Sequence, residues 1–381
     1  MSTSSPRNPG LDTLRALAIA LVVLHHYVLF VSGESTFGAV GDVGWIGVDL
    51  FFALSGYLIG NQIFAAMRRP DGLSLGRFYA RRLLRTVPNF YVVLALYALW
   101  PWFRNHLELP PLWEFLTFTQ NINLMPGTAF SHAWSLCIEE QFYMVLPALA
   151  LLLAPARRGA RATWVVLALV LAGGLCARAW MWTHRVEGAD SPGLNYYIYI
   201  YYSSLCRLDE LVAGVALALL KNHHPQAWQR ATSHGNLAAA CALPILLGTC
   251  WLFLDERMAL PVTLVGFPLL GLSFALLIVA ALSRRSVLAT LHVPGARQLA
   301  LWSFAIYLVH KQVSILSAIG LKGMGIQPGS WVAIVALNAL SVLCGYLLYV
   351  CVETPFMLVR DRYFPPTGAM RQPSMTPNAD A

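Results

Sequence analysis

The stretch LDTLRALAIALVVLHHYVLF, residues 11–30, decides the fold class, because it is long and apolar enough to cross a bilayer. It also carries two ionisable side chains, Arg15 and His26, eleven positions apart. On an α-helix, eleven steps of about 100° return to within roughly 20° of the starting direction, while the axial separation grows to ~16 Å. Arg15 and His26 therefore share a helix face three turns apart, whereas His25 points about 80° away.

Ionisable groups inside a membrane helix need an explanation. A cation near the middle of such a helix costs at least ~2.5 kcal/mol, which favours a functional role for Arg15 and His26. The alternative is structural: Arg15 extends its charged end to the inner membrane surface, and His26 fills a polar notch between helices. The first helix alone favours neither interpretation.

Composition places the whole chain in the membrane. It is 57% hydrophobic and 12% charged, whereas soluble domains carry about 25% charged residues. The sequence therefore predicts an all-α, polytopic integral membrane protein with about ten transmembrane helices. We expect the spans near residues 11–31, 45–65, 86–103, 137–154, 162–182, 205–220, 237–254, 261–282, 299–317 and 331–352.

The distribution of Lys and Arg between the predicted spans gives the orientation. With the N-terminus inside, the inner segments hold 18 of these residues and the outer loops only Arg104, Arg185, Arg257 and Lys322. This asymmetry predicts that both termini are cytoplasmic. We expect a cytoplasmic segment at 1–10, a transmembrane domain at 11–356, and a cytoplasmic, disordered tail at 357–381, which is Pro-rich and polar from Pro365.

The formal net charge of +8 and the seven cysteines indicate no further partner. The cations follow the membrane pattern, and no interleaved basic and aromatic stripe indicates a nucleic acid partner. The cysteines lie in or beside the spans without a C-x-x-C pair, so they are interpreted as packing residues rather than metal ligands.

A row of arginines precedes the third span. In RFYARRLLRTVPNFY, Arg77, Arg81 and Arg85 recur at four-residue spacing, with Arg82 beside them. Inner-leaflet charge explains part of this pattern. Guanidinium groups in a row are also suited to hold phosphates through bidentate hydrogen bonds.

Polar side chains also interrupt other spans. HAWSLCIEEQFYMVLP places Glu139 and Glu140 about 100° apart on one helix, so only one of them is expected to face the bundle. GWIGVDLFFALSGYLIG carries Asp49 with Gly47, Gly56 and Gly60 as close-packing points, CRLDELVAG carries Arg207, and SFAIYLVHKQVSI carries Tyr307 and His310. Pairing between helices explains any one of these residues. Six of ten spans with such residues indicate a shared polar cavity.

In this order, Arg15-x10-His26, GVDLFFALSGYLI, FYARRLLRTVP, HAWSLCIEEQFYMVLP, CRLDELVAG, YLVH and VETP resemble the signatures of the acyltransferase 3 family of membrane O-acyltransferases. The resemblance covers about residues 10–356. It implies ten helices in the bacterial cytoplasmic (inner) membrane, an acyl-CoA donor from the cytoplasm, and a surface or exported carbohydrate or glycolipid acceptor. It also implies that Arg15 and His26 are the functional pair. Lys311 and Gln312 depart from the family pattern, and the chain resembles the stand-alone form without an esterase-like domain.

The resulting hypothesis joins geometry and chemistry. The four arginines hold the nucleotide of acyl-CoA, with Arg15 further along its path. His26 acts as general base on the acceptor hydroxyl or carries the acyl group itself. Glu140, or equally Glu139, orients His26. The expected substrate contacts are Arg77, Arg81, Arg82, Arg85, Asp49, Trp134, Ser135, Arg207, Tyr307 and His310.

The donor is expected to be acetyl-CoA, as in most members of the family, with no bound cofactor. Aromatic outer loops at 104–133 and 183–204 suit either sugar stacking or anchoring at the membrane interface. The alternative function is a transporter or flippase of lipid-linked sugar, which also places charged residues inside a bundle. A non-catalytic subunit with helix-pairing charges is a third interpretation.

Overall fold

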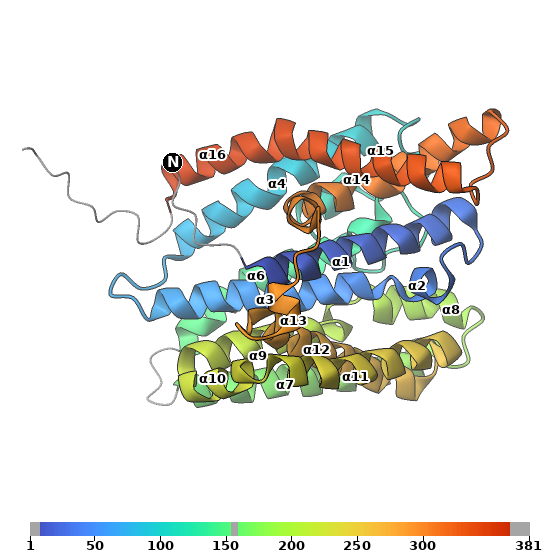
Figure 1. Cartoon of the computed structure of the whole chain (residues 1–381). Helices are drawn as coiled ribbons and strands as arrows, with labels where there is room; N and C mark the ends of the chain where they lie inside the picture. Colours follow the sequence, from blue (N-terminus) through green and yellow to red (C-terminus); the bar gives the residue numbers. More distant parts are fainter. Residues whose placement is uncertain (1–7, 154–158, 366–381) are drawn as a thin grey trace, which may run out of the picture.

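A computed structural model describes residues 8–153 and 159–365. Within these ranges every regular element is a helix, and the long helices lie side by side in one bundle (Figure 1). The α-helices are α1 (Pro9–Tyr27), α2 (Gly38–Val43), α3 (Ile46–Met67), α4 (Leu75–Leu99), α5 (Leu112–Leu116), α6 (Trp134–Leu153), α7 (Gly159–Met181), α8 (Pro192–Tyr196), α9 (Asp209–His223), α10 (Pro225–Ser233), α11 (Gly235–Glu256), α12 (Leu260–Leu282), α13 (Val287–Thr290), α14 (Ala296–Gly323), α15 (Trp331–Leu348) and α16 (Thr354–Tyr363). Four π-helical segments, η1 (Val28–Ser32), η3 (Trp182–Val186), η4 (Tyr197–Tyr201) and η6 (Tyr349–Glu353), and two 3-10 turns, η2 (Ser131–Ala133) and η5 (Ser204–Cys206), connect or extend them.

The prediction of a polytopic, all-helical membrane protein is confirmed. Each of the ten predicted spans falls on a helix, and eight helical stretches of the described chain are long and apolar enough to cross a membrane. The exceptions are α4, whose first half carries the arginine row, and α9, which has 15 residues where a perpendicular span needs about 20. The qualifying stretches are Pro9–Ser32, Ile46–Met67, Ser131–Leu153, Gly159–Val186, Gly235–Glu256, Leu260–Leu282, Ala296–Gly323 and Trp331–Tyr363.

The ends of the described chain lie at the same end of the bundle. α1 begins, and α16 ends, toward the left of Figure 1. The cytoplasmic location of that end stays a prediction. Helix α16 continues to Tyr363, so residues 357–363 of the predicted tail are helical, and residues 366–381 lie outside the described residues.

Local sequence signals set the limits of the first helix. The Asn8 side chain accepts a hydrogen bond from the Leu11 amide at 3.1 Å, and Pro9 occupies the first turn, where its missing N–H costs nothing. After η1 the chain turns at Gly33, whose φ of 69° is in the left-handed region that favours glycine. His26 therefore lies in the last turn of α1, close to one end of the bundle.

Helices α3 and α9 approach so closely that side chains are excluded at the crossing. A Cβ at Gly56 would lie 2.1 Å from the Leu211 carbonyl oxygen, and one at Gly214 would lie 2.2 Å from the Ala53 carbonyl oxygen. Without a hydrophobic driving force between helices in lipid, such backbone approach is a main source of packing energy. The prediction that Gly56 is a close-packing point is confirmed.

Two buried ion pairs join α9 to its neighbours. Asp49 of α3 pairs with Arg207, which lies two residues before the start of α9. Arg178 of α7 forms a two-point pair with Asp209 of α9, with N···O distances of 2.5 and 2.9 Å. All four side chains are buried, so each charge depends on its partner.

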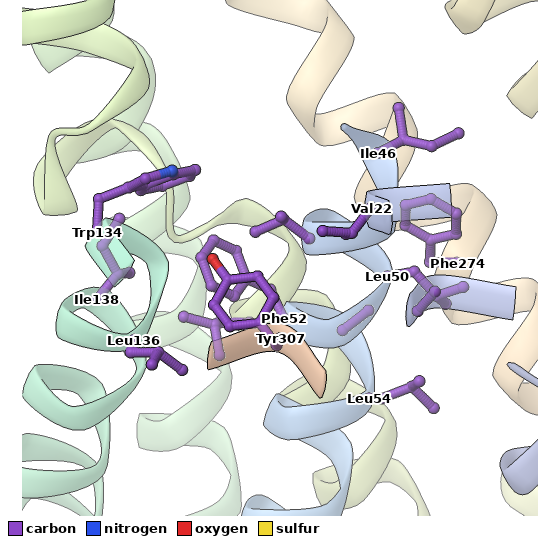
Figure 2. Packing of buried hydrophobic residues seen from close by; sticks show 14 of the residues in the cluster. Val22, Ile46, Leu50, Phe52, Leu54, Trp134, Leu136, Ile138, Phe274 and Tyr307 are labelled. Carbon is purple, nitrogen blue, oxygen red and sulfur yellow. The ribbon is translucent and has the colours of Figure 1, made fainter. Parts of the chain in front are cut away.

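Aromatic and aliphatic side chains fill the space between these helices. Figure 2 shows Trp134 of α6, Phe52 of α3 and Tyr307 of α14 directed into one layer with Val22 of α1. The Phe52 and Trp134 rings meet edge to face at 6.1 Å. Val22, Trp134 and Tyr307 of this layer also line the cavity next to His26.

We predict that Asp209→Leu destabilises the protein more than replacement of both members of its pair. The single substitution leaves the Arg178 guanidinium buried without a counter-charge, which costs about 3–5 kcal/mol. The double variant Asp209→Leu/Arg178→Met removes both charges and should recover most of this loss. Thermal unfolding in detergent measures the difference. A double variant as unstable as the single one would contradict the prediction.

Candidate functional site

Three histidines from separate elements meet at one end of the bundle. His26 Nδ1 lies 2.7 Å from His310 Nε2, and the two rings are parallel within 2°. The His132 ring, on η2, lies 6.0 Å from the His26 ring and 5.8 Å from the His310 ring. In the part of the chain that the structure describes, no group of three His, Cys, Asp or Glu side chains is arranged to hold a metal ion.

The hydrogen bonds of His310 determine which nitrogen of His26 is basic. His310 Nδ1 lies 3.0 Å from the Ile306 carbonyl oxygen and 2.9 Å from the Tyr307 carbonyl oxygen. Carbonyl oxygens only accept, so Nδ1 of His310 carries the proton and its Nε2 accepts in the neutral ring. His26 Nδ1 therefore donates to His310. The lone pair of neutral His26 is consequently on Nε2.

His26 borders a cavity of about 230 Å³. The lining residues come from α1, η1, α3 and the residue before it, the segment before α6, the first residue of α6, η4 and the residue after it, α14, and the residue that follows α11. They include His25, His26, Trp45, Ser131, His132, Trp134, Tyr197, Tyr201, Tyr202, Arg257 and Tyr307. The lining of the cavity is thus mainly aromatic. Its charged or titratable side chains apart from the tyrosines are those of the histidines and of Arg257.

A hydrogen-bond chain fixes one wall of this cavity. The Tyr307 hydroxyl donates to the His132 carbonyl oxygen, so the 2.6 Å contact with Ser135 Oγ has Ser135 as the donor. Both groups are buried. Ser135 therefore supports Tyr307, and Tyr307 holds the His132 segment against α14.

A buried cation lies beside the histidines. Lys311 Nζ donates to Ser131 Oγ at 3.3 Å and lies 4.2 Å from the centre of the Phe30 ring. Since Ser131 accepts this bond, its own O–H is available to the cavity that it lines. Sequence reasoning noted Lys311 as a polar residue deep in the ninth span and as a departure from the family pattern, but gave it no role, and it did not single out His132 or Ser131. The available signal was that His132 is the first residue of the HAWSLC motif and that Ser131 directly precedes it.

His25 also lines the cavity, although helix phase points it away from the face of Arg15 and His26. Its Nδ1 lies 2.8 Å from the Gly41 carbonyl oxygen, which is an acceptor, so Nδ1 donates. The two adjacent histidines therefore border the same space with different partners. Helix phase alone did not predict this, because the cavity extends beyond one face of α1 toward Trp45 and Val48.

Asp49 and Arg207 were expected to contact substrate, and the structure shows what these two side chains contact within the chain. They pair with each other, and neither side chain has any exposed surface. The Arg207 guanidinium lies 4.5 Å from the centre of the Tyr201 ring and 5.3 Å from that of Trp134. Its influence on the cavity is therefore indirect, through two rings that line it.

Glu139 and Glu140 were expected to orient His26, and the structure places them elsewhere. Glu140 Oε1 lies 3.4 Å from Arg82 of α4, while Glu139 lies against Ser55 and Tyr143. Glu140 follows Trp134 by six residues, or ~9 Å along α6. The nitrogen of His310, rather than a carboxylate, takes the position next to His26.

The arginine row is largely engaged by carboxylates. Arg81 pairs with Asp361 of α16 at 3.3 Å and donates to the Phe364 carbonyl oxygen. Arg82 pairs with Glu140 and lies 4.0 Å from the centre of the Tyr143 ring. Arg85 lies within electrostatic range of Glu353, and Arg77 is half-buried. The arginine row of α4 thus contacts α6 and α16, at the end of the bundle away from the histidines.

Arg15 lies on α1 between these two regions. It is half-buried and has interactions within the chain. Three helical turns, or ~16 Å, separate it from His26 along the axis. The structure therefore places Arg15 and His26 at different depths of the bundle.

The aromatic loop at 183–204 contributes directly to the cavity. Tyr197, Tyr201 and Tyr202 line it, and their rings contact one another at 5.3–5.9 Å. Burial raises the pKa of the Tyr201 and Tyr202 hydroxyls, which lie outside the membrane spans, so both remain neutral at physiological pH. They offer flat surfaces and uncharged hydroxyls to a ligand.

The chain is similar to bacterial O-acetyltransferases. It is 29% identical over 229 residues to the peptidoglycan O-acetyltransferase OatA of Listeria monocytogenes, covering 56% of this chain and 34% of that protein. It is 28% identical over 333 residues to the putative peptidoglycan O-acetyltransferase YrhL of Bacillus subtilis, covering 81% and 49%. The O-acetyltransferase OatA of Staphylococcus aureus is 27% identical over 234 residues, covering 57% and 35%.

The chain thus spans about a third to a half of the length of these relatives. No solved structure matches it. The family model described as an acyltransferase domain matches residues 8–350, which include every residue of the histidine cluster and its cavity. The chain therefore belongs to the acyltransferase 3 family.

Proposed function

We propose that the protein is a multi-pass enzyme of the bacterial cytoplasmic membrane. It transfers an acyl group, acetyl in the first instance, from cytoplasmic acyl-CoA to a carbohydrate hydroxyl outside. The observation that carries the proposal is the lone pair of His26 Nε2, which is fixed by His310 in a cavity with aromatic walls. The similarity to O-acetyltransferases supports the type of group transferred.

His26 performs the central proton transfer. Its Nε2 takes the proton of the acceptor hydroxyl as the oxygen attacks the thioester carbonyl, and the C–S bond then breaks to release CoA as its thiol. In the alternative order, Nε2 attacks the carbonyl first and the C–S bond breaks, so that CoA leaves as its thiolate. The hydroxyl then attacks the acyl-imidazole, the C–N bond breaks to restore His26, and the hydroxyl proton passes to the thiolate. Both orders need Nε2 unprotonated and Nδ1 bonded to His310, so the structure supports them equally.

Ser131 is placed to stabilise the oxyanion of either order. Lys311 donates to Ser131 Oγ, so the Ser131 O–H is polarised by a nearby positive charge and is available to the cavity. A preorganised donor of this kind contributes most where water is excluded. Lys311 does not line the cavity, so its positive charge acts on a ligand through the hydroxyl of Ser131.

The donor enters from the opposite end of the bundle in this proposal. The arginines of α4 supply guanidinium groups for the nucleotide phosphates, and Arg15 lies between them and His26. The ~16 Å along α1 from Arg15 to His26 is comparable to the extended pantetheine arm. The acyl group therefore crosses most of the membrane while attached to its carrier.

We predict that His26→Ala strongly reduces transfer while the protein remains folded. Loss of a general base lowers kcat by about 10²–10⁴-fold. The purified full chain in detergent, with radiolabelled acetyl-CoA and a candidate glycan, measures the effect. His25→Ala is the matched control, because His25 borders the same cavity but donates to a backbone carbonyl. Equal transfer by wild type and His26→Ala would disprove the role, and no transfer from any donor would favour a transporter.

We predict that His310 acts through His26. His310→Leu leaves the His26 Nδ1–H without its acceptor, so kcat should fall by about 10–100-fold, as for outer-shell partners of functional histidines, with little change in KM. His310→Gln retains an acceptor oxygen and should recover part of kcat. Steady-state kinetics of both variants test this. A loss that is equal in Leu and Gln variants, or confined to KM, would contradict the positioning role.

A further inference from the structure

We propose that Arg257 forms a binding site for an acidic group of the acceptor, so that the acceptor is an anionic carbohydrate. This inference rests on the proposed function for the identity of the cavity. The inference goes beyond the proposed function because it assigns a charge to the acceptor. Arg257 directly follows α11 and lines the same cavity as His26.

The guanidinium of Arg257 is enclosed by aromatic rings. Its carbon lies 4.6 Å from the centre of the Trp45 ring, 5.2 Å from that of Tyr201 and 5.5 Å from that of Tyr197. The side chain is half-buried, and its Nε is buried without a hydrogen-bond partner among the described residues. Cation–π contacts at such distances offset part of the desolvation of the charge.

Arg257 differs from other arginines of the bundle because no carboxylate of the described residues pairs with it. Arg82, Arg178 and Arg207 also lie over aromatic rings, and each also pairs with a carboxylate. Within residues 8–153 and 159–365, Arg257 has neither an ion pair nor a hydrogen bond. A cation kept partly desolvated in a cavity, with donors unused, is arranged for an anionic ligand.

The geometry selects the kind of anion. Aromatic rings interact with a guanidinium through its charge and leave N–H donors, which form a planar fork. A carboxylate or a phosphate monoester matches this fork with two parallel hydrogen bonds. Both groups occur on sugars, so the site recognises the shared feature of two anionic oxygens.

The cavity also limits where the acid lies on the acceptor. Arg257 and His26 border one space of about 230 Å³, smaller than the ~300–1,000 Å³ that hold drug-sized ligands. The acidic group and the hydroxyl that approaches His26 therefore belong to the same sugar or to adjacent sugars. Trp45, Trp134 and the tyrosines of η4 supply surfaces against which the sugar ring stacks.

A binding experiment tests this without requiring acyl transfer. The purified full chain in detergent is titrated with cellobiose, cellobiouronic acid or cellobiose 6-phosphate, and quenching of tryptophan fluorescence reports occupancy beside Trp45 and Trp134. We expect the acidic disaccharides to bind about 10-fold or more tightly than cellobiose, as for a charge-assisted hydrogen-bonded pair. Whichever acid binds more tightly identifies the carboxylate or the phosphate as the natural group.

Variants assign the preference to Arg257. Arg257→Gln should bring the affinities for the acidic ligands close to the affinity of the same variant for cellobiose. Arg185→Gln is the matched control, because Arg185 lies 5.2 Å from the centre of the Tyr199 ring but does not line the cavity. Equal binding of all three ligands, no binding of any, or a preference that survives Arg257→Gln would overturn the proposal.

The outcome is separable from the proposed function. A preference for acidic ligands that depends on Arg257 in a protein that transfers no acyl group would retain the anion site and reject the enzyme. Acetyl transfer to neutral glycans that is unaffected by Arg257→Gln would retain the enzyme and reject the anion site.

Discussion

The buried guanidinium of Arg207 is the interaction on which the arrangement of this protein depends. It neutralises Asp49 of α3, donates to the Tyr201 carbonyl oxygen at 3.2 Å, and lies 4.2 Å from the centre of the Phe267 ring of α12. In lipid, neither charge has water as an alternative partner, so the pair also fixes the helices that carry it. Because the same guanidinium contacts the rings of Trp134 and Tyr201, a charge needed for folding also determines the shape of the cavity.

Among the described residues, by contrast, no carboxylate contacts the His26–His310 pair, and the two histidines hydrogen-bond to each other. His26 and His310 come from α1 and α14, which pack against each other along the bundle. Backbone carbonyls of α14 accept from Nδ1 of His310, and Nε2 of His310 accepts from Nδ1 of His26. The helix backbone therefore determines which nitrogen of each histidine carries the proton. A neutral acceptor orients the imidazole but gives less stabilisation to its protonated form than a carboxylate does. This arrangement suits His26 either as a base that returns its proton quickly or as a nucleophile that is neutral before the reaction.

Much of the fold followed from the sequence, because hydropathy and helix length are local properties. The ten predicted spans all fall on helices, and the phase of residues 11–30 selected His26 without knowledge of its neighbours. The partners of the buried charges could not be predicted, because phase gives the direction of a side chain on one helix but not which helix it faces. Glu140 was therefore paired with His26 instead of Arg82, and Asp49 was assigned to substrate instead of Arg207. His132 and Ser131 were missed because the predicted span began at residue 137, after the short turn that carries them.

The pairing of Arg81 with Asp361 and with the Phe364 carbonyl oxygen has a thermodynamic consequence. These contacts attach α16 to α4, and a phosphate that binds Arg81 competes with them directly. Occupancy by a nucleotide and attachment of α16 are then reciprocally linked: each weakens the other by the same factor. The last described helix would in that case report on donor binding, and any partner that holds it in place would lower the affinity for the donor.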